Sequence, residues 1–319
     1  MQVALIISSA LGLPLLHELA GQGALAAVAV PRIPAHPYEP EQVAQAAAAL
    51  GLPVARLHRA TLAADLAAWL GPEPPAAVLV FMLPWRVPVA LLDVPRWGFL
   101  NFHLAALPAY RGPEPLFWQL RNGEAAGAVT VHRMAADFDT GPVLLALPVP
   151  IGPADTHGLH RAQLAHYAVE AGRHLLAGLR GVVPLVPVPQ NPATARYWPR
   201  ATLADVCIAW HEPAEVIARL VRATNPWNRG ALATSRGQPL RVLAATPRPE
   251  TTPAPPGTVV WAAPGQGLLV ACGAGQVLQL DVVALDEGYF SGGQLAALGV
   301  QVGEVLGTLA PALADQIQA

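Results

Sequence analysis

The amino-acid sequence predicts an α/β fold followed by a small β-barrel, and three observations carry this prediction. Through the first half of the chain, short apolar runs alternate with helical patterns, which is typical of a mostly parallel sheet covered on both faces. A proline-rich stretch at residues 183–192 then interrupts the alternation. Beyond it, short strand patterns bounded by Gly and Pro follow one another, as they do in small barrels.

The elements of the first half are predicted from the spacing of apolar residues. Continuous apolar runs indicate buried strands, which are expected at residues 3–7, 27–30, 77–81, 98–102, 128–134 and 143–149. Apolar residues at helical spacing indicate helices, which are expected at residues 12–21, 41–50 and 155–179. His17 and Glu18 interrupt the first apolar run before it reaches a spanning length, so we expect a cytoplasmic protein with no membrane partner.

The proline-rich stretch is the predicted domain boundary, because such a segment is stiff and cannot form a helix. The predicted division is a catalytic domain at residues 1–188, a linker at 189–204 and a second domain at 205–319. The second domain is expected to hold one helix near residues 213–223 and a polar, proline-rich loop at 247–256. Its predicted strands are residues 240–244, 257–261, 267–272 and 277–284.

The composition excludes several classes of protein. The chain is 53% hydrophobic and 13% charged, which is too apolar for a disordered protein. Its 19 basic residues are all arginine and face 21 acidic residues, so no excess of positive charge points to nucleic acid. Without lysine, neither Schiff-base chemistry nor a Walker-type phosphate loop is available. The distant Cys207 and Cys272 form no metal-binding pair, and we predict no metal site.

Polar side chains at the end of the fourth predicted strand mark the candidate site. Asn101 and His103 are two residues apart, which places them on the same face of a strand. An amide and an imidazole side by side can stabilise an oxyanion, and a carboxylate such as Asp139 can orient the histidine or hold a proton. The alternative is that both residues cap the strand. For His132 and Arg133, on the next strand, surface roles are favoured over contacts with an acceptor.

A set of short motifs runs along the first domain in a fixed order. The motifs are Asn101-Phe102-His103, Leu107-Pro108, Tyr110-Arg111-Gly112, Gly127-Ala128-Val129-Thr130 and Asp139-Thr140-Gly141. In order and spacing they resemble the signature of the folate-dependent formyltransferases. The resemblance implies a Rossmann-like formyltransferase fold and transfer of a formyl group from 10-formyltetrahydrofolate to a primary amine, without a metal.

The resemblance also implies roles for individual residues. Asn101 would donate a hydrogen bond to the formyl oxygen, and His103 would stabilise the tetrahedral oxyanion and help proton movement. Asp139 would position a water or the histidine and accept the proton of the attacking amine. The folate would lie between two loops that match the family by position, which contain Phe81, Met82, Leu83 and Trp85 on one side and Ala136, Asp137 and Phe138 on the other.

The likeness continues beyond the linker and covers nearly the whole chain. Residues 205–210, 213–215 and 221–227 are similar to the opening of the second domain of methionyl-tRNA formyltransferase and of a bacterial UDP-amino-arabinose enzyme. In both, that domain is an open, OB-like β-barrel. One departure lies in the first domain, where Ala105 stands in place of a serine that the family usually carries, and this bears on the acceptor more than on the reaction.

The acceptor amine is predicted from charge. The tRNA enzymes carry a long basic insert after the second strand, whereas residues 30–38 are short here and hold one arginine. The second domain holds six arginines against nine acids, which disfavours tRNA. We therefore expect a small amine, such as a nucleotide-linked amino sugar. The alternatives are methionyl-tRNA, hydrolysis of the formyl donor and a non-catalytic folate-binding protein, and a homo-oligomer stays open.

Overall fold

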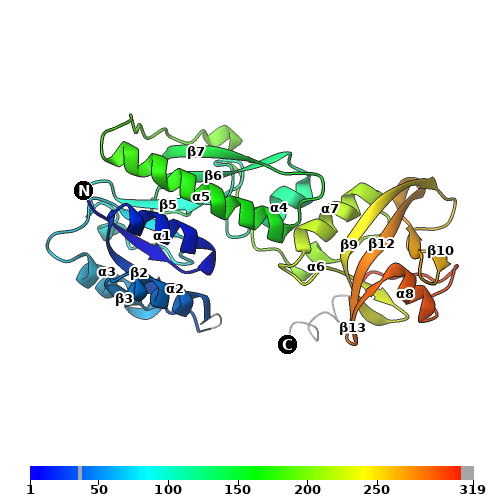
Figure 1. The fold of residues 1–319 in the computed structure, drawn as a ribbon. Helices are drawn as coiled ribbons and strands as arrows, with labels where there is room; N and C mark the ends of the chain where they lie inside the picture. Colours follow the sequence, from blue (N-terminus) through cyan, green and yellow to red (C-terminus); the bar gives the residue numbers. More distant parts are fainter. Residues whose placement is uncertain (35–37, 310–319) are drawn as a thin grey trace. The chain divides into compact units, whose positions relative to one another are not determined.

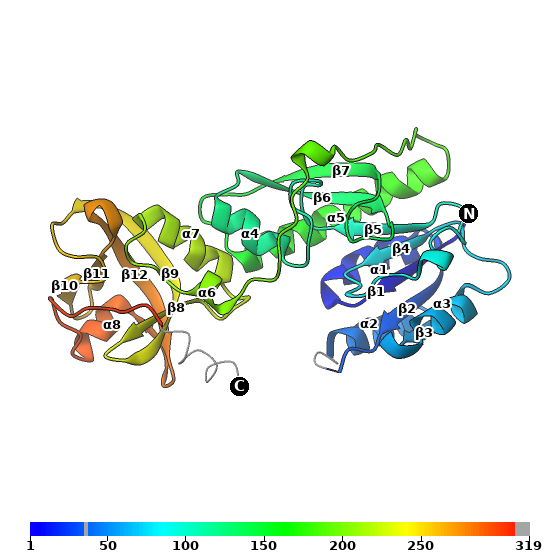
Figure 2. The ribbon, with the colours of Figure 1, turned by 180° about the vertical axis from the view of Figure 1, so that it is seen from behind.

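The computed structural model describes residues 1–34 and 38–309, which form two compact units (Figure 1 and Figure 2). Unit 1 comprises Met1–Pro115, Ala126–Pro150 and Arg161–Pro199. Unit 2 comprises Leu116–Ala125, Ile151–His160 and the described residues from Arg200 onward. Each unit is built on its own sheet. The division into a catalytic domain that ends at residue 188 and a second domain that begins at residue 205 stays a prediction. Residues 310–319 of that second domain lie outside the described ranges.

Unit 1 contains a mostly parallel sheet with the strand order β3-β2-β1-β4-β5-β6-β7. The strands are β1 (Val3–Ile7), β2 (Leu25–Pro31), β3 (Val54–Leu57), β4 (Val78–Phe81), β5 (Phe99–His103), β6 (Ala126–Arg133) and β7 (Val143–Pro150). The first five pair in parallel, whereas β6 pairs antiparallel with β5 and with β7. The predicted α/β class is confirmed. The sequence analysis overlooked β3, a four-residue edge strand in which only Leu57 is buried.

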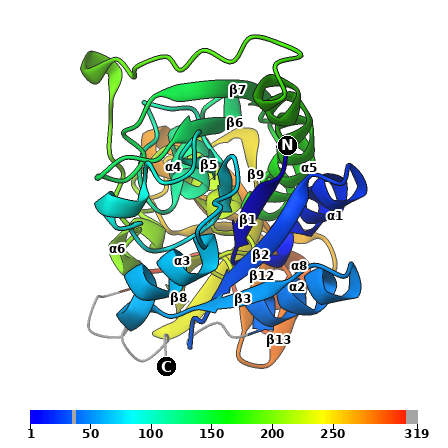
Figure 3. The ribbon, with the colours of Figure 1, turned by 90° about the vertical axis from the view of Figure 1, so that its left-hand side faces the viewer.

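Helices cover both faces of this sheet, as Figure 3 shows. They are α1 (Leu13–Gly21), α2 (Tyr38–Ala49), α3 (Leu62–Leu70) and α5 (His157–Leu179). Side chains alternate along β1: Ile6 belongs to the core beneath α3, while Ile7 points to the opposite face, where it meets the turn that begins α1. The alanine-rich α3 was not predicted. Within the described ranges, no helix combines the length and the apolarity that crossing a membrane requires.

Unit 2 holds an antiparallel sheet with the order β10-β11-β12-β9-β8, and β13 pairs with β12. The strands are β8 (Ala231–Ser235), β9 (Gln238–Thr251), β10 (Val259–Ala263), β11 (Gly267–Ala271), β12 (Gln276–Leu285) and β13 (Gly288–Ser291). The helices are α4 (Pro115–Asn122), α6 (Leu203–Val206), α7 (Ala214–Thr224) and α8 (Gly292–Ala297). Ile217 and Val221 of α7 are buried, and this helix packs on β9.

One short segment joins the two edges of the unit 2 sheet. The amide of Gly303 donates to the carbonyl of Val259 in β10, and Gly307 exchanges two hydrogen bonds with Thr234 in β8. Both edge strands are therefore tied by residues 303–307, which curves the sheet toward closure. This arrangement agrees with the barrel that the sequence predicts for the second domain.

The predicted loop at residues 247–256 is partly wrong, because β9 continues to Thr251. Pro247 lies opposite Leu278 of β12, whereas β8 pairs with β9 only at residues 238–242. The last residues of β9 therefore pair on one side only. A proline lacks an N–H, and at a one-sided position the missing donor interrupts no ladder, so prolines that suggested a loop are compatible with a strand.

The turn that follows β5 depends on a glycine. Gly112 has φ of 118°, and a Cβ built on it would lie 2.0 Å from the carbonyl oxygen of Trp198. Any side chain at this position would meet both backbone strain and a steric clash. Gly181 also has a positive φ, of 76°, but a Cβ there would meet nothing within 4 Å.

We predict that Gly112→Ala lowers the free energy of unfolding by about 3 kcal/mol, from the strained φ and the overpacking together. Gly181→Ala is the matched control and should lose about 1 kcal/mol, because only the backbone conformation opposes it. Urea denaturation of the two variants measures the difference. Equal losses would show that the approach of Trp198 to Gly112 does not constrain the fold.

Candidate functional site

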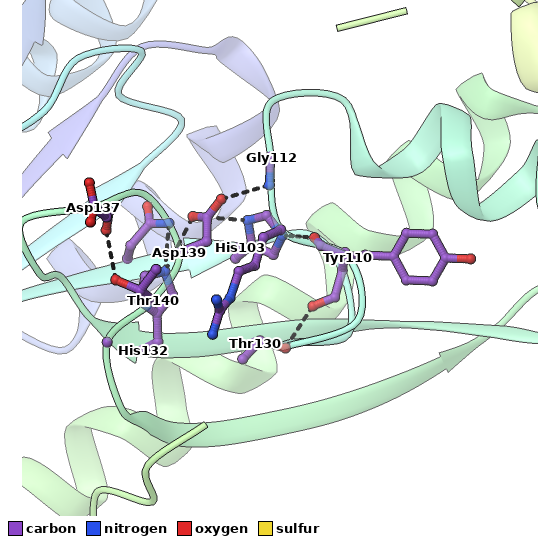
Figure 4. Close-up of polar contacts among 12 residues, drawn as sticks. His103, Tyr110, Gly112, Thr130, His132, Asp137, Asp139 and Thr140 are labelled. Atoms are coloured by element: carbon purple, nitrogen blue, oxygen red, sulfur yellow. Dashed lines mark hydrogen bonds and ion pairs between the residues drawn. The ribbon is translucent and has the colours of Figure 1, made fainter. Parts of the chain in front are cut away.

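The candidate site is assembled by the antiparallel pairing of β5 with β6. In this register Asn101 lies opposite His132, and His103 lies opposite Thr130. Asp139 comes from the loop between β6 and β7, and Figure 4 shows its carboxylate next to the two histidines. The structure thus brings together the three residues that the sequence analysis singled out, and it adds a fourth, His132.

His103 is buried, with 6% of its surface exposed, and both ring nitrogens have defined neighbours. Nε2 lies 2.6 Å from the carbonyl oxygen of Tyr110, and Nδ1 lies 3.5 Å from Oδ1 of Asp139. A carbonyl oxygen can only accept, so Nε2 carries a hydrogen, and Nδ1 is the ring nitrogen that can gain or lose a proton beside the Asp139 carboxylate. Burial lowers the pKa of His103 below the ordinary value of histidine, although Asp139 and the carbonyl of Tyr110 oppose this shift.

Asp139 is held by contacts to both of its carboxylate oxygens. Oδ2 accepts a hydrogen bond of 2.9 Å from the amide of Gly112, while Oδ1 lies 3.5 Å from His103 and 3.6 Å from His132. Burial alone would raise the pKa of Asp139, but the contact with His132, the charge that His103 carries when protonated and the amide of Gly112 outweigh it and lower that pKa to about 2. The carboxylate is therefore ionised throughout the neutral range.

Asn101 is oriented by His132. Nδ1 of His132 lies 3.0 Å from the carbonyl oxygen of Arg133, so it carries the ring hydrogen, and Nε2 accepts from the Asn101 amide at 3.1 Å. His132 is 1% exposed, and the surface role expected for it is wrong. His132 is buried because β6 pairs with β5. Its position within an apolar strand pattern was a signal in the sequence that could have indicated this burial.

The two loops expected to hold the folate follow β4 and the antiparallel strand β6, which lie on either side of β5. Phe81 is fully buried with its ring 6.4 Å from that of Phe102, so its side chain belongs to the core. Met82, which follows β4, is 40% exposed and has a positive φ of 63°; the Ser8 hydroxyl donates to its carbonyl. The Ser8 contact holds this loop in a strained backbone conformation.

Arg86 links the two loops. Its guanidinium lies 3.2 Å from the carboxylate of Asp137 and 5.1 Å from the centre of the Phe138 ring. Leu83 and Trp85 pack against the core while staying partly accessible, and Ala136 is exposed. Partly exposed apolar side chains lie on one loop, and Arg86 holds the other loop to it. Such an arrangement suits a flat heterocycle that packs on apolar side chains and hydrogen-bonds backbone groups.

The site combines three chemical capacities at one point. An amide N–H can polarise a carbonyl oxygen, a neutral imidazole can take a proton, and a fixed carboxylate can stabilise the imidazolium that results. No side chain among them needs to form a covalent bond. Among residues 1–34 and 38–309, no group of three or more metal-ligating side chains is arranged to hold an ion.

Two families of known domains match the chain. Residues 36–172 match the family described as "Formyl transferase", and residues 200–291 match "Formyl transferase, C-terminal domain". Together these matches cover well over half of the chain. Methionyl-tRNA formyltransferase of Thiobacillus denitrificans is 35% identical over 278 residues, which are 82% of this chain and 84% of that protein.

Solved structures share the fold at low sequence identity. WlaRD, a sugar 3N-formyl transferase crystallised with dTDP and 5-N-formyl-THF, superposes with a TM-score of 0.65 at 13% identity, covering 88% of this chain and 96% of that one. HypX from Aquifex aeolicus in complex with tetrahydrofolic acid gives 0.61 at 17% identity, over 93% of this chain and 48% of that one.

We predict that the pKa of the His103 ring lies below the ordinary value of histidine and that Asp139→Asn lowers it further, because the neighbouring negative charge is removed. Asp137→Asn is the matched control: it removes an exposed carboxylate two residues away that pairs with Arg86, and it should leave the titration unchanged. Ring NMR signals, assigned with His103→Gln, measure both values. An unchanged or higher His103 pKa in Asp139→Asn would contradict the geometry.

Proposed function

The chain belongs to the formyl transferase family, and from this premise we propose that it transfers the formyl group of 10-formyltetrahydrofolate to the nitrogen of a primary amine. The observation that carries the proposal is the cluster formed by the Asn101 amide and the His103 imidazole of β5 with the Asp139 carboxylate from the loop after β6. The substrate supplies an activated formyl group, and the acceptor nitrogen displaces tetrahydrofolate from it.

Asn101 is the proposed donor to the formyl oxygen. Its amide nitrogen carries two hydrogens, of which one is directed at Nε2 of His132. The second is left for a substrate oxygen, which gains negative charge as the amine attacks. Because His132 fixes the rotation of the amide beforehand, the donor needs no reorganisation during the reaction, and one such donor is typically worth about 3 kcal/mol.

His103 is the proposed proton acceptor, in preference to Asp139. A carboxylate with a pKa of about 2 is a weak base, whereas the lone pair on Nδ1 of His103 is available at neutral pH. When Nδ1 takes the proton of the attacking amine, Asp139 stabilises the imidazolium from 3.5 Å. The proton then returns to the nitrogen of the leaving tetrahydrofolate, so that His103 ends the cycle neutral.

The donor side of the proposal is supported by the loops that Arg86 ties together. Leu83, Trp85 and Phe138 supply apolar surface, and the exposed backbone around Met82 supplies hydrogen-bonding groups. Solved structures of the same fold contain tetrahydrofolate or 5-N-formyl-THF, which fits a folate substrate for this chain.

For the acceptor, we propose the α-amine of methionyl-tRNA as the first candidate. This was the alternative in the sequence analysis, and relatives that share a third or more of their residues with most of the chain favour it. A small amine, such as a nucleotide-linked amino sugar, is the second candidate. The short connection at residues 30–38, part of which lies outside the described residues, and the acidic balance of the second domain support it.

We predict that Asn101→Ala and His103→Gln each lower kcat/KM for formyl transfer at least about 100-fold while leaving the folded state intact. His58→Gln, which changes an exposed histidine paired with Asp65, is the control and should keep full activity. Tetrahydrofolate formation and circular dichroism are the measurements. A double variant of Asn101 and His103 with wild-type turnover would refute the assignment.

The acceptor is decided by offering the purified chain and 10-formyltetrahydrofolate three alternatives. Charged initiator tRNA should be formylated if the relatives share their acceptor with this chain, and a panel of nucleotide-linked amino sugars tests the second candidate. The third arm contains no amine. Formate release in that arm at a rate equal to any transfer would identify a hydrolase and overturn the proposed transfer to an amine.

A further inference from the structure

An extended segment of unit 1, residues 186–199, runs beside the site and is called the strap here. After α5 the chain passes along β7 (Figure 3), where Val188 exchanges two hydrogen bonds of 2.8 Å with Val143. Farther along, the Trp198 ring stacks on Tyr110 at 5.6 Å, and the amide of Trp198 donates to the carbonyl of Arg111. The strap is therefore fastened to unit 1 at both ends.

Between these two anchors the strap directs one side chain at the catalytic loop. Nε2 of Gln190 donates to the carbonyl of Asp139 at 2.8 Å and to the carbonyl of Gly141 at 2.7 Å. Oε1 of Gln190 accepts from Nε and Nη2 of Arg111 at 3.0 and 2.7 Å. Most of the neighbouring strap residues are exposed, but Gln190 is half-buried.

The orientation of the Gln190 amide follows from its partners. The guanidinium of Arg111 can only donate, and the two carbonyls can only accept. A rotated amide would place a donor against a donor and an oxygen against two oxygens. Both amide hydrogens and both lone pairs of Gln190 are used in the observed orientation, which joins the turn after β5 to the loop that carries Asp139.

That loop needs support, because its backbone is strained. Asp139 has φ of 58°, in the left-handed region that non-glycine residues adopt at a cost of about 1–2 kcal/mol. Two residues later, Gly141 passes so close to the carbonyl of Arg133 that a Cβ would lie 1.8 Å from it. Gln190 bonds the carbonyls of Asp139 and Gly141, and so it spans the strained turn.

We propose that Gln190 is a positioning residue that holds the Asp139 carboxylate against His103 by fixing the backbone of its loop. Its effect on turnover rests on the proposed formyl transfer, whereas its effect on the loop does not. The strap acts on both partners of the Asp139–His103 contact: through Gln190 it holds Asp139, and through Trp198 and Tyr110 it supports the carbonyl that accepts from His103.

Two substitutions test this role. Gln190→Glu keeps an acceptor for Arg111 but presents a carboxylate oxygen to two carbonyls, and Gln190→Met keeps the length of the side chain without either donor. Both should lower kcat about 10- to 100-fold, with the KM for the folate donor changed less than about twofold, because displacement of a reacting group affects the chemical step. Asn191→Ala, which removes the neighbouring cap of a short turn, is the control and should keep the wild-type kcat.

A second measurement requires no activity. The amide of Gly112 donates to Oδ2 of Asp139, so its hydrogen exchange, followed by NMR in the full chain, reports where that carboxylate lies. Exchange at Gly112 should accelerate at least about tenfold in both Gln190 variants and stay unchanged in Asn191→Ala.

Unchanged exchange at Gly112 together with an unchanged kcat would overturn the role of Gln190. A wild-type chain that transfers no formyl group would refute the proposed function, and the exchange measurement would then still decide the role of Gln190. A loss of kcat accompanied by normal Gly112 exchange would also contradict positioning through Asp139.

Discussion

One buried carboxylate organises the candidate site. Asp139 is removed from bulk water, yet a backbone amide on one oxygen and two imidazoles near the other keep it ionised. Its charge in turn gives His103 a partner for the protonated state that burial alone would suppress. Each of these groups lies on a different element, so the site exists only when β5, β6, the turn at Gly112 and the Asp139 loop are all in place.

Much of this arrangement could be predicted from the sequence. The apolar runs predicted four of the five parallel strands, and a spacing of two placed Asn101 and His103 on one face of β5. The resemblance added Asp139. The pattern of a single strand does not show which residue lies opposite on the neighbouring strand. His132 contacts Asn101 only because of the β5–β6 register, so its role in the site was missed.

Other features escaped because a local signal competed with a distant contact. The prolines of residues 247–256 suggested a loop, but at a one-sided position they are tolerated in β9. The same composition hid Gln190, a polar residue within a proline-rich linker, whose four hydrogen bonds all lead to segments at least 49 residues away. The net charge of the second domain, by contrast, can be counted directly from the sequence. The acceptor remains the part of the function that the donor chemistry does not determine.

The segment that ties the two edges of the unit 2 sheet has a consequence for biosynthesis. Residues 303–307 are among the last of the described chain, and they hydrogen-bond to β10 and β8, which are completed much earlier. Until residues 303–307 have been synthesised, the outer edges of β10 and β8 lack the backbone hydrogen bonds that this segment supplies. Exposed edges of this kind recruit other strands, so we expect the unit 2 sheet to be most prone to edge-to-edge association before this segment docks.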